Sequence, residues 1–170
     1  MKRCVFLLAL LAATFSGHAA EKPRPVEKAN VLPLALDDAF QFRKTELFFN
    51  DAEAHPQSTD NEMILFERQR VNFGAINSVQ RRARSGNYFT FFWRTSRHAN
   101  LTFRLEYRQE KLGSYVEAQE VPYTDAHGSV RTQFNVIGDD YYQNGRVVAW
   151  RALLIENGKI VGLTQSYLWN

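Results

Sequence analysis

The chain has 170 residues, of which 45% are hydrophobic, and a formal net charge of +3. A charge this small, without a block of like charges, gives no support to nucleic acid as a partner, and we expect none. The only cysteine is Cys4, which excludes a disulfide framework as the source of stability.

The first twenty residues have the pattern of a secretory signal. Lys2 and Arg3 precede the apolar stretch 5–15, and small residues follow, so we expect cleavage near Ala19 or Ala20. The apolar stretch is shorter than the roughly 20 residues of a spanning helix, and we expect no transmembrane span elsewhere. Cleavage lowers the number of Lys and Arg residues from 21 to 19, against 18 acidic residues. An exported, disulfide-free, nearly neutral chain predicts a soluble protein that is periplasmic or secreted, from a bacterium.

Two segments precede the regular part of the chain. Residues 21–30 are charged and contain prolines without periodicity, which predicts an extended leader. Residues 31–62 are expected to be irregular, or to contain a short helix that begins at Asp37, and to pack on the domain through their phenylalanines. The domain itself is expected to span residues 63–170.

From Met63 onward the hydrophobic spacing shifts towards two, which is the period of a strand with one buried face. The clearest alternation lies in 100–109, where Arg104, Glu106 and Arg108 share the side opposite the apolar residues. A helix remains an alternative for the first of the predicted strands. The pattern predicts about seven strands, at 63–75, 87–94, 100–109, 115–123, 128–138, 146–156 and 159–169.

The last two predicted strands form a hairpin. Asn157-Gly158 tolerates the positive φ that both central positions of a type I′ turn require. Counting outward from this turn points Trp150 into the core and Arg151 to the other face, because a one-residue slip would exchange them. The same register gives these pairs on the outer face: Arg151 with Thr164, and Ala149 with Ser166.

Short strands at spacings of roughly 8 to 12 residues are typical of an antiparallel β-sandwich. The stretch "LTFRLEYRQ" is similar to the third strand of immunoglobulin and fibronectin type III modules, and "RVVAWRALLIENG" and "KIVGLTQSYLW" are similar to their last two. This resemblance is to an architecture and covers 63–169. The sequence departs from it in lacking a cysteine pair and a tyrosine at the corner spacing. The resemblance implies that the third strand lies beside the sixth.

The outer face that follows from this arrangement is a candidate partner-binding surface. Guanidinium groups bind carboxylates and phosphates through paired hydrogen bonds. An ordinary solvated sheet face is the favoured alternative, because Glu106 lies among the arginines and cross-strand ion pairs are common on such faces. The residues of this face are Arg104, Arg108, Arg151, Thr164 and Ser166.

The stretch "YFTFFW" at 88–93 has more aromatic residues than one buried face can hold. Phe89, Phe91 and Trp93 form one set, which we expect in the core. Tyr88 and Phe92 form the other, which either packs under residues 31–62 or remains an open aromatic platform that can stack on sugar rings. Burial under 31–62 is favoured, because the phenylalanines of that segment need apolar neighbours.

The sequence shows no motif for catalysis or for binding a cofactor. A Gly-x-Ser-x-Gly elbow and a phosphate-binding loop are both missing. A calcium-type spacing within 51–62 has Pro56 where that loop requires glycine. His55, His98 and His127 are expected in separate turns, solvated. We therefore predict no catalytic residues, no metal and no cofactor.

These observations predict an exported, non-catalytic β-sandwich that acts as a binding or structural module of a bacterial envelope or periplasm. Its partner is expected to be another envelope protein, bound by the arginine face or by the loops near 81–87. The alternative is a glycan-binding domain that uses the aromatic platform. A hydrolase without a recognisable motif is a third, less favoured interpretation.

Overall fold

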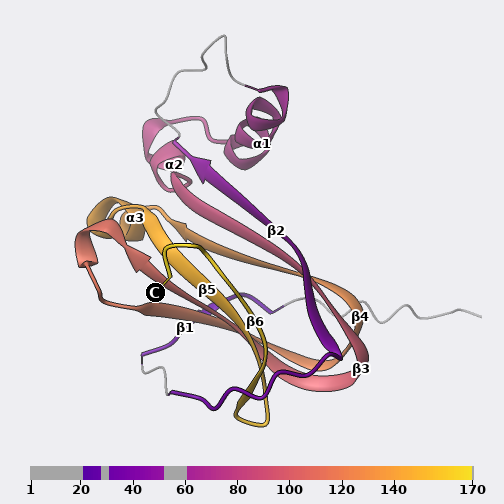
Figure 1. The fold of residues 1–170 in the computed structure, drawn as a ribbon. Coiled ribbons are helices and arrows are strands. Elements are labelled where there is room, and N and C mark those ends of the chain that lie inside the picture. Colours follow the sequence, from indigo (N-terminus) through magenta and orange to yellow (C-terminus); the bar gives the residue numbers. More distant parts are fainter. Residues whose placement is uncertain (1–20, 28–30, 52–60, 170) are drawn as a thin grey trace, which may run out of the picture.

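The structure is a computed structural model that describes residues 21–27, 31–51 and 61–169 (Figure 1). The predicted secretion signal lies outside the described residues, and so does His55 in the calcium-type spacing.

Antiparallel strands dominate the described chain, as the sequence predicts for an all-β fold. The helices are short and lie at the ends of the strands. In chain order the elements are β1 (Arg24–Pro25), β2 (Phe40–Asn50), α1 (Glu62–Asn72), α2 (Ser78–Arg82), β3 (Gly86–Gln109), the 3₁₀ helix η1 (Glu110–Leu112), β4 (Glu117–Ile137), α3 (Asp139–Asn144), β5 (Val147–Glu156) and β6 (Lys159–Gln165).

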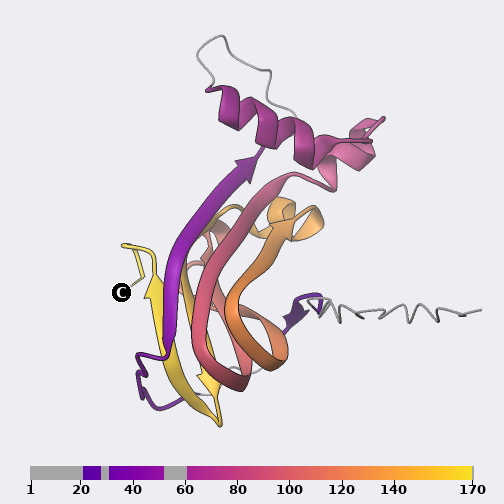
Figure 2. The ribbon, with the colours of Figure 1, turned by 90° about the vertical axis from the view of Figure 1, so that its right-hand side faces the viewer.

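One long ribbon organises the sheet. Strands β3 and β4 pair with each other over nearly their whole length. The second edge of β3 is shared, because its first half pairs with β2 and its second half pairs with β5. Strand β6 extends the sheet beyond β5, and β1 extends it beyond β4. The described strands therefore form a single antiparallel sheet, consistent with a β-sandwich because its two halves face each other (Figures 1 and 2).

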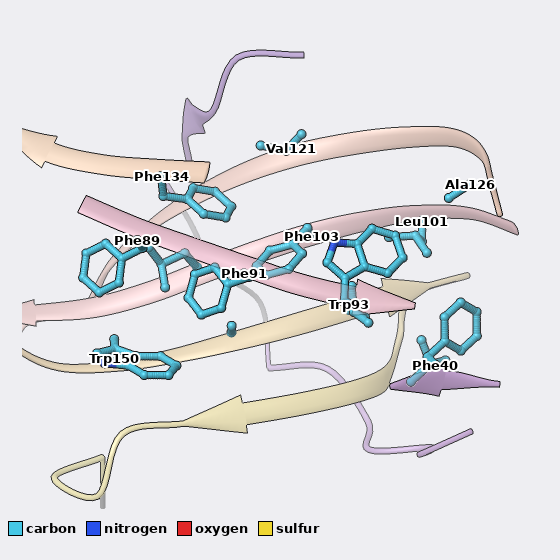
Figure 3. Close-up of a cluster of buried hydrophobic side chains, with 14 of the residues drawn as sticks. Phe40, Phe89, Phe91, Trp93, Leu101, Phe103, Val121, Ala126, Phe134 and Trp150 are labelled. Carbon is cyan, nitrogen blue, oxygen red and sulfur yellow. The ribbon is translucent and has the colours of Figure 1, made fainter. Parts of the chain in front are cut away.

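The ribbon bends where its register shifts, between Thr95 and Ala99 of β3. Beyond the bend the second half of β3 folds back over the first, so side chains from both halves meet. The ring of Phe91 lies 5.2 Å from that of Phe103 and 5.4 Å from that of Trp150, between centroids. Figure 3 shows these rings packed between the two halves of the sheet. This aromatic cluster is the centre of the core.

The hydroxyl of Thr132 forms hydrogen bonds with two aromatic side chains of the core. Thr132 is buried, its hydroxyl accepts a 2.8 Å hydrogen bond from the indole nitrogen of Trp93, and it lies 2.7 Å from the hydroxyl of Tyr123. Burial raises the pKa of the Tyr123 hydroxyl. Thr132 therefore satisfies two polar groups that would otherwise lack a partner in the core.

Replacing Thr132 with valine keeps the shape of the side chain and removes the hydroxyl. We expect Thr132→Val to lower the free energy of unfolding by roughly 1–3 kcal/mol, because the Trp93 indole loses its partner. Urea denaturation measures this loss. Thr124→Val, on an exposed position of the same strand, is the control and should change stability by less than about 0.5 kcal/mol. Equal effects of the two substitutions would contradict the role of the hydroxyl.

The predicted strand at 63–75 is wrong, because this segment contains helix α1. Asn61 caps the helix by accepting a hydrogen bond from the backbone nitrogen of Met63, and Glu62 and Arg70 lie at the ends that suit their charges. None of the residues of α1 is buried. Its hydrophobic spacing therefore does not report a buried face, and the cap was the better signal.

Residues 31–62 also differ from the prediction, because they contribute strand β2 and contain no helix that begins at Asp37. The Asp37 carboxylate instead accepts a hydrogen bond from the backbone nitrogen of Ala39 at 2.8 Å, which forms a local turn. Strand β2 follows this turn and places Phe40 in the core, with Phe42 packed against it.

Four of the other predicted strands are present, but they join in pairs into two long strands. Those at 87–94 and 100–109 are the two halves of β3, and those at 115–123 and 128–138 correspond to the two halves of β4. The ribbon bends at these places without ending, because Thr95 and Gly128 remain paired across it. A turn-like sequence therefore marks a bend inside a strand here.

The hairpin turn is confirmed, since Asn157 and Gly158 have φ values of 50° and 71°. The predicted register holds for two pairs and then fails at a bulge between Leu154 and Ile155, opposite Val161. The bulge buries both Ile160 and Val161, in two different apolar clusters. This double burial is the physical reason for the shift.

Candidate functional site

The two halves of the folded sheet each have an outer face, and these faces differ. We call the outer side of β5 and the second half of β3 the arginine face. Its predicted neighbours are present, because Glu106 pairs directly with Arg151 across the two strands. Trp150 is buried on the opposite side, as predicted. The resemblance-based expectation that these two strands lie side by side is therefore confirmed.

The arginine face is a network of ion pairs. Glu106 lies 2.5 Å from the Nε of Arg151 and 3.6 Å from Arg104. Arg104 also donates a 2.6 Å hydrogen bond to Glu120. Glu106 is only 3% exposed and Arg104 only 8%. The expectation of an ordinary solvated face is therefore wrong for these two side chains.

The terminal segments of the domain cover this network. Trp169 is buried against it, with Arg108 and Arg151 stacked on its ring at 4.6 and 5.0 Å. From the other side, Leu32 packs on a small apolar cluster that contains Leu153. A hollow of about 590 Å³ remains over the arginine face, with Tyr115 among its lining residues. The face is thus largely closed by the chain itself.

Two residues predicted on this face lie elsewhere. The bulge at Val161 pairs Thr164 with Ala152, which is a core residue. Ser166 likewise faces Trp150, whose backbone nitrogen donates a 3.0 Å hydrogen bond to the Ser166 hydroxyl. Thr164 and Ser166 therefore belong to the core side of the sheet. The structure brings together only Arg104, Arg108 and Arg151 of the predicted set.

The network predicts that replacing a buried glutamate lowers the free energy of unfolding much more than replacing an exposed one. Glu106→Gln should lower the free energy of unfolding by about 3 kcal/mol, since it breaks a buried pair and leaves Arg104 with less compensation. Glu46→Gln, on an exposed position of β2, should change it by less than about 0.5 kcal/mol. Urea denaturation of the two variants makes the comparison. Equal stability of the two variants would show that the network is not buried in solution.

The opposite outer face belongs to β2, the first half of β3 and the second half of β4, and we call it the open face. Here the three strands align outward side chains in three rows. Each row has one residue from each strand, in the order β2, β3, β4. The rows are Lys44, Phe92 and Arg131; Glu46, Thr90 and Gln133; and Phe48, Tyr88 and Asn135. We refer to these nine residues as the lattice.

The contacts within the lattice hold its side chains in place. Lys44 forms an ion pair with Glu46 at 2.6 Å, and its ammonium group lies 5.9 Å from the centre of the Phe92 ring. Gln133 donates a 3.2 Å hydrogen bond to the Thr90 hydroxyl. These contacts position the Gln133 amide and the Phe92 ring on the open face, where both line the groove described below.

Tyr88 joins the lattice to the segment that precedes β3. Its hydroxyl donates a 2.8 Å hydrogen bond to the backbone oxygen of Arg84, and its ring contacts that of Phe48. Burial raises the pKa of the Tyr88 hydroxyl to about 12. The group is therefore protonated at physiological pH, as its role as a donor requires.

Helix α1 makes one wall of a groove over the open face. The groove has a volume of about 1030 Å³, and α1 contributes Met63, Ile64 and Glu67 to its lining. Glu67 accepts a 2.6 Å hydrogen bond from Arg70, which also lines the groove, and this bond raises the pKa of Arg70. Four basic and two acidic side chains line the groove in all. It therefore combines aromatic surface, amides and an excess of positive charge.

The predicted division of the aromatic stretch is confirmed. Phe89, Phe91 and Trp93 are buried in the core, and Tyr88 and Phe92 lie on the other side. Within the described part of residues 31–62, β2 pairs beside this second pair in the sheet, and Phe48 contacts the ring of Tyr88. Residues 52–60 of that segment lie outside the described residues. Glu46 and Phe48 were missed as site residues because β2 was not recognised; a period of two from Phe40 to Phe42 was the available signal.

The structure also brings together two histidines that were expected apart. His98 and His127 stack with ring centroids 4.4 Å apart, and Asp125 lies 2.7 Å from His98. The bend of the ribbon makes this possible, because it joins two distant parts of the sequence. Among the described residues, no three His, Cys, Asp or Glu side chains gather in a way that could hold a metal ion.

Comparisons with known proteins return no family. No protein-family model matches the chain, and neither curated proteins nor solved structures give a significant match. In the part of the chain that the structure describes, none of the helices has both the length and the apolar character to span a bilayer.

Proposed function

We propose that this chain is an exported, non-catalytic binding module of a bacterial envelope or periplasm, and that the groove over the open face holds its ligand. The observation that carries the proposal is the groove between helix α1 and the aligned side chains of the lattice. Export is supported by the signal pattern of residues 1–20. The absence of recognisable catalytic motifs in the sequence supports binding without chemistry.

The chemistry of the groove favours a glycan that carries acidic groups. A sugar ring has an apolar C–H face, which can stack on an aromatic ring, and hydroxyl groups, which need donors and acceptors. Phe92 and Tyr88 supply the rings, while Thr90 and Gln133 lie between them on the same face. The basic side chains exceed the acidic ones around the groove by two, which favours a negatively charged ligand.

Direct titration tests this proposal. The probes are uronic acid oligosaccharides, their neutral counterparts and soluble peptidoglycan fragments, followed by isothermal calorimetry. We expect binding of the acidic probes, and a loss of affinity of about tenfold or more in Phe92→Ala, since the ring would be a central contact. Arg131→Gln should weaken binding of the acidic probes and leave any binding of the neutral ones unchanged.

Tyr115→Ala is the matched control, because Tyr115 is an exposed aromatic residue that lines the hollow of the arginine face. It should leave the affinity unchanged. Titrations that show no heat with any probe would contradict the glycan assignment. Binding that Tyr115→Ala abolishes and Phe92→Ala does not would place the ligand on the arginine face.

A second candidate is a partner protein bound at the arginine face. The hollow beside Arg108 and Arg151 supports it, because both guanidinium groups stack on Trp169 there and give this part of the face positive charge. It is the weaker candidate, since Arg151 already forms an ion pair with Glu106. Of the predicted partner surface, this candidate retains Arg108 and Arg151.

We also propose that the likeness to immunoglobulin and fibronectin type III modules is one of architecture. It is supported by the position of β5 beside the second half of β3. The unbroken passage of β3 and β4 through both halves of the sheet is a feature that this likeness does not predict.

A further inference from the structure

Residues 61–84 form a unit that stands apart from the sandwich, and we call it the helical tip. It consists of α1, α2 and the turns that join them to each other and to β3. Figures 1 and 2 show the tip beyond the ends of β2 and β3, on the side away from the β5–β6 turn. The tip is therefore the most projecting part of the described chain.

The tip is held to the domain by polar contacts. Asn50 and Asn72 exchange two amide hydrogen bonds, at 3.0 and 3.1 Å. The backbone oxygen of Arg84 accepts hydrogen bonds from the Asn50 amide and the Tyr88 hydroxyl, both at 2.8 Å. No residue of either helix is buried. Helices of this length gain most of their stability from packing an apolar side. Among the elements that the structure describes, none buries the apolar side chains of the tip.

Four large apolar side chains of the tip are exposed and do not line the groove. They are between 63% and 86% exposed. Phe66 and Phe73 are seven residues apart, which places them on the same side of α1 and its C-cap. Several exposed large apolar residues concentrated in one projecting element indicate an interaction site. The residues are Phe66, Phe73, Ile76 and Val79.

Positive charge accompanies this apolar surface. Residues 61–84 contain five arginines and two glutamates. Arg81 and Arg82 are exposed in the last turn of α2, next to Val79 in the same helix, and Arg82 also stacks on Tyr142 at 4.0 Å. With the signal segment set aside the whole chain has 19 basic and 18 acidic residues, so its positive charge is concentrated in the tip.

We propose that the helical tip docks on an anionic lipid surface. Phe66, Phe73 and Ile76 would enter the boundary between headgroups and acyl chains, and Arg81 and Arg82 would contact the lipid phosphates. The positive charge of the tip favours a lipid surface over a protein partner, because exposed apolar side chains together with arginines complement the acyl chains and the anionic headgroups of a membrane. The short helices lie on such a surface and do not cross it. This site uses residues outside the groove, so it does not depend on the ligand proposed there.

Cosedimentation with vesicles tests the proposal. The chain is purified after export by a bacterial host and its N-terminus is determined, so that wild type and variants are compared in the same form. The vesicles contain phosphatidylcholine alone or phosphatidylcholine with phosphatidylglycerol. We expect binding to the anionic vesicles only, weakened by high salt. The double variant Phe73→Ser, Ile76→Ser should lose binding by roughly tenfold or more, and Arg81→Gln and Arg82→Gln by about fivefold each.

Two variants outside the tip serve as controls. Tyr167→Ser removes an aromatic ring that is as exposed as those of the tip, and Arg131→Gln removes one positive charge from the open face. Both should bind vesicles like the wild type, and all variants should keep the wild-type unfolding midpoint. The proposal is overturned if anionic vesicles do not bind the wild type, or if the control variants lose as much binding as the tip variants. A wild-type protein that binds anionic vesicles and no glycan would contradict the function proposed for the groove, and it would still support lipid binding by the tip.

Discussion

The contact between Phe91 and Phe103 depends on a single constraint, which is the bend of the β3–β4 ribbon. These two residues lie on one strand, on either side of the bend, and their rings are 5.2 Å apart between centroids. Without the bend the ribbon would be a flat pair of strands whose apolar sides would face solvent. With it, the apolar sides of both halves form one core, and β2 and β5 can each pair with a different half of β3. The fold thus follows from one long ribbon that closes on itself.

This closure creates two outer faces, of which one is largely covered by the chain and the other is open. On the arginine face, Trp169 packs on Arg108 and Arg151, and Leu32 packs on the neighbouring cluster that contains Leu153. On the open face, β2 lies in the plane of the sheet and leaves the rings of Tyr88 and Phe92 beside the groove. The charges of this buried network are already paired within the protein, which leaves them less available to a ligand. The open face is the better candidate for binding for that reason.

The sequence predicts the features that depend on local chemistry. The turn at Asn157-Gly158 and the opposite directions of Trp150 and Arg151 follow from the needs of a type I′ turn and from alternation. The sides taken by Tyr88 and Phe92 follow from alternation as well. Each of these needs only neighbouring residues, and each is present in the structure.

Features that depend on distant contacts could not be predicted in the same way. The bulge at Val161 arises where residues 33–37 pair with β6, and it moves Thr164 and Ser166 to the core side. The return of Trp169 over the arginines likewise depends on the folded sheet. Helix α1 has no buried residue, so its apolar residues need not follow the spacing of a helix that packs on a core.

The groove and the helical tip share α1, which links the two proposals in space. One side of the helix lines the groove through Ile64 and Glu67. Phe66 lies outside the groove and is exposed. A module that rests its tip on a lipid surface would therefore hold the groove beside that surface. Its ligand would be a component of the envelope close to the membrane.

The most direct test of the account is the accessibility of the two outer faces. Single cysteines are introduced at Gln133 on the open face and at Leu153, which is 1% exposed on the arginine face, in a Cys4→Ser chain that has no other cysteine. The rate of reaction with a maleimide is measured under native conditions and again in denaturant, where both thiols should react equally. In the native protein we expect rapid reaction at position 133 and strong protection at position 153. Equal native rates in two folded variants would contradict the distinction between an open and a closed face.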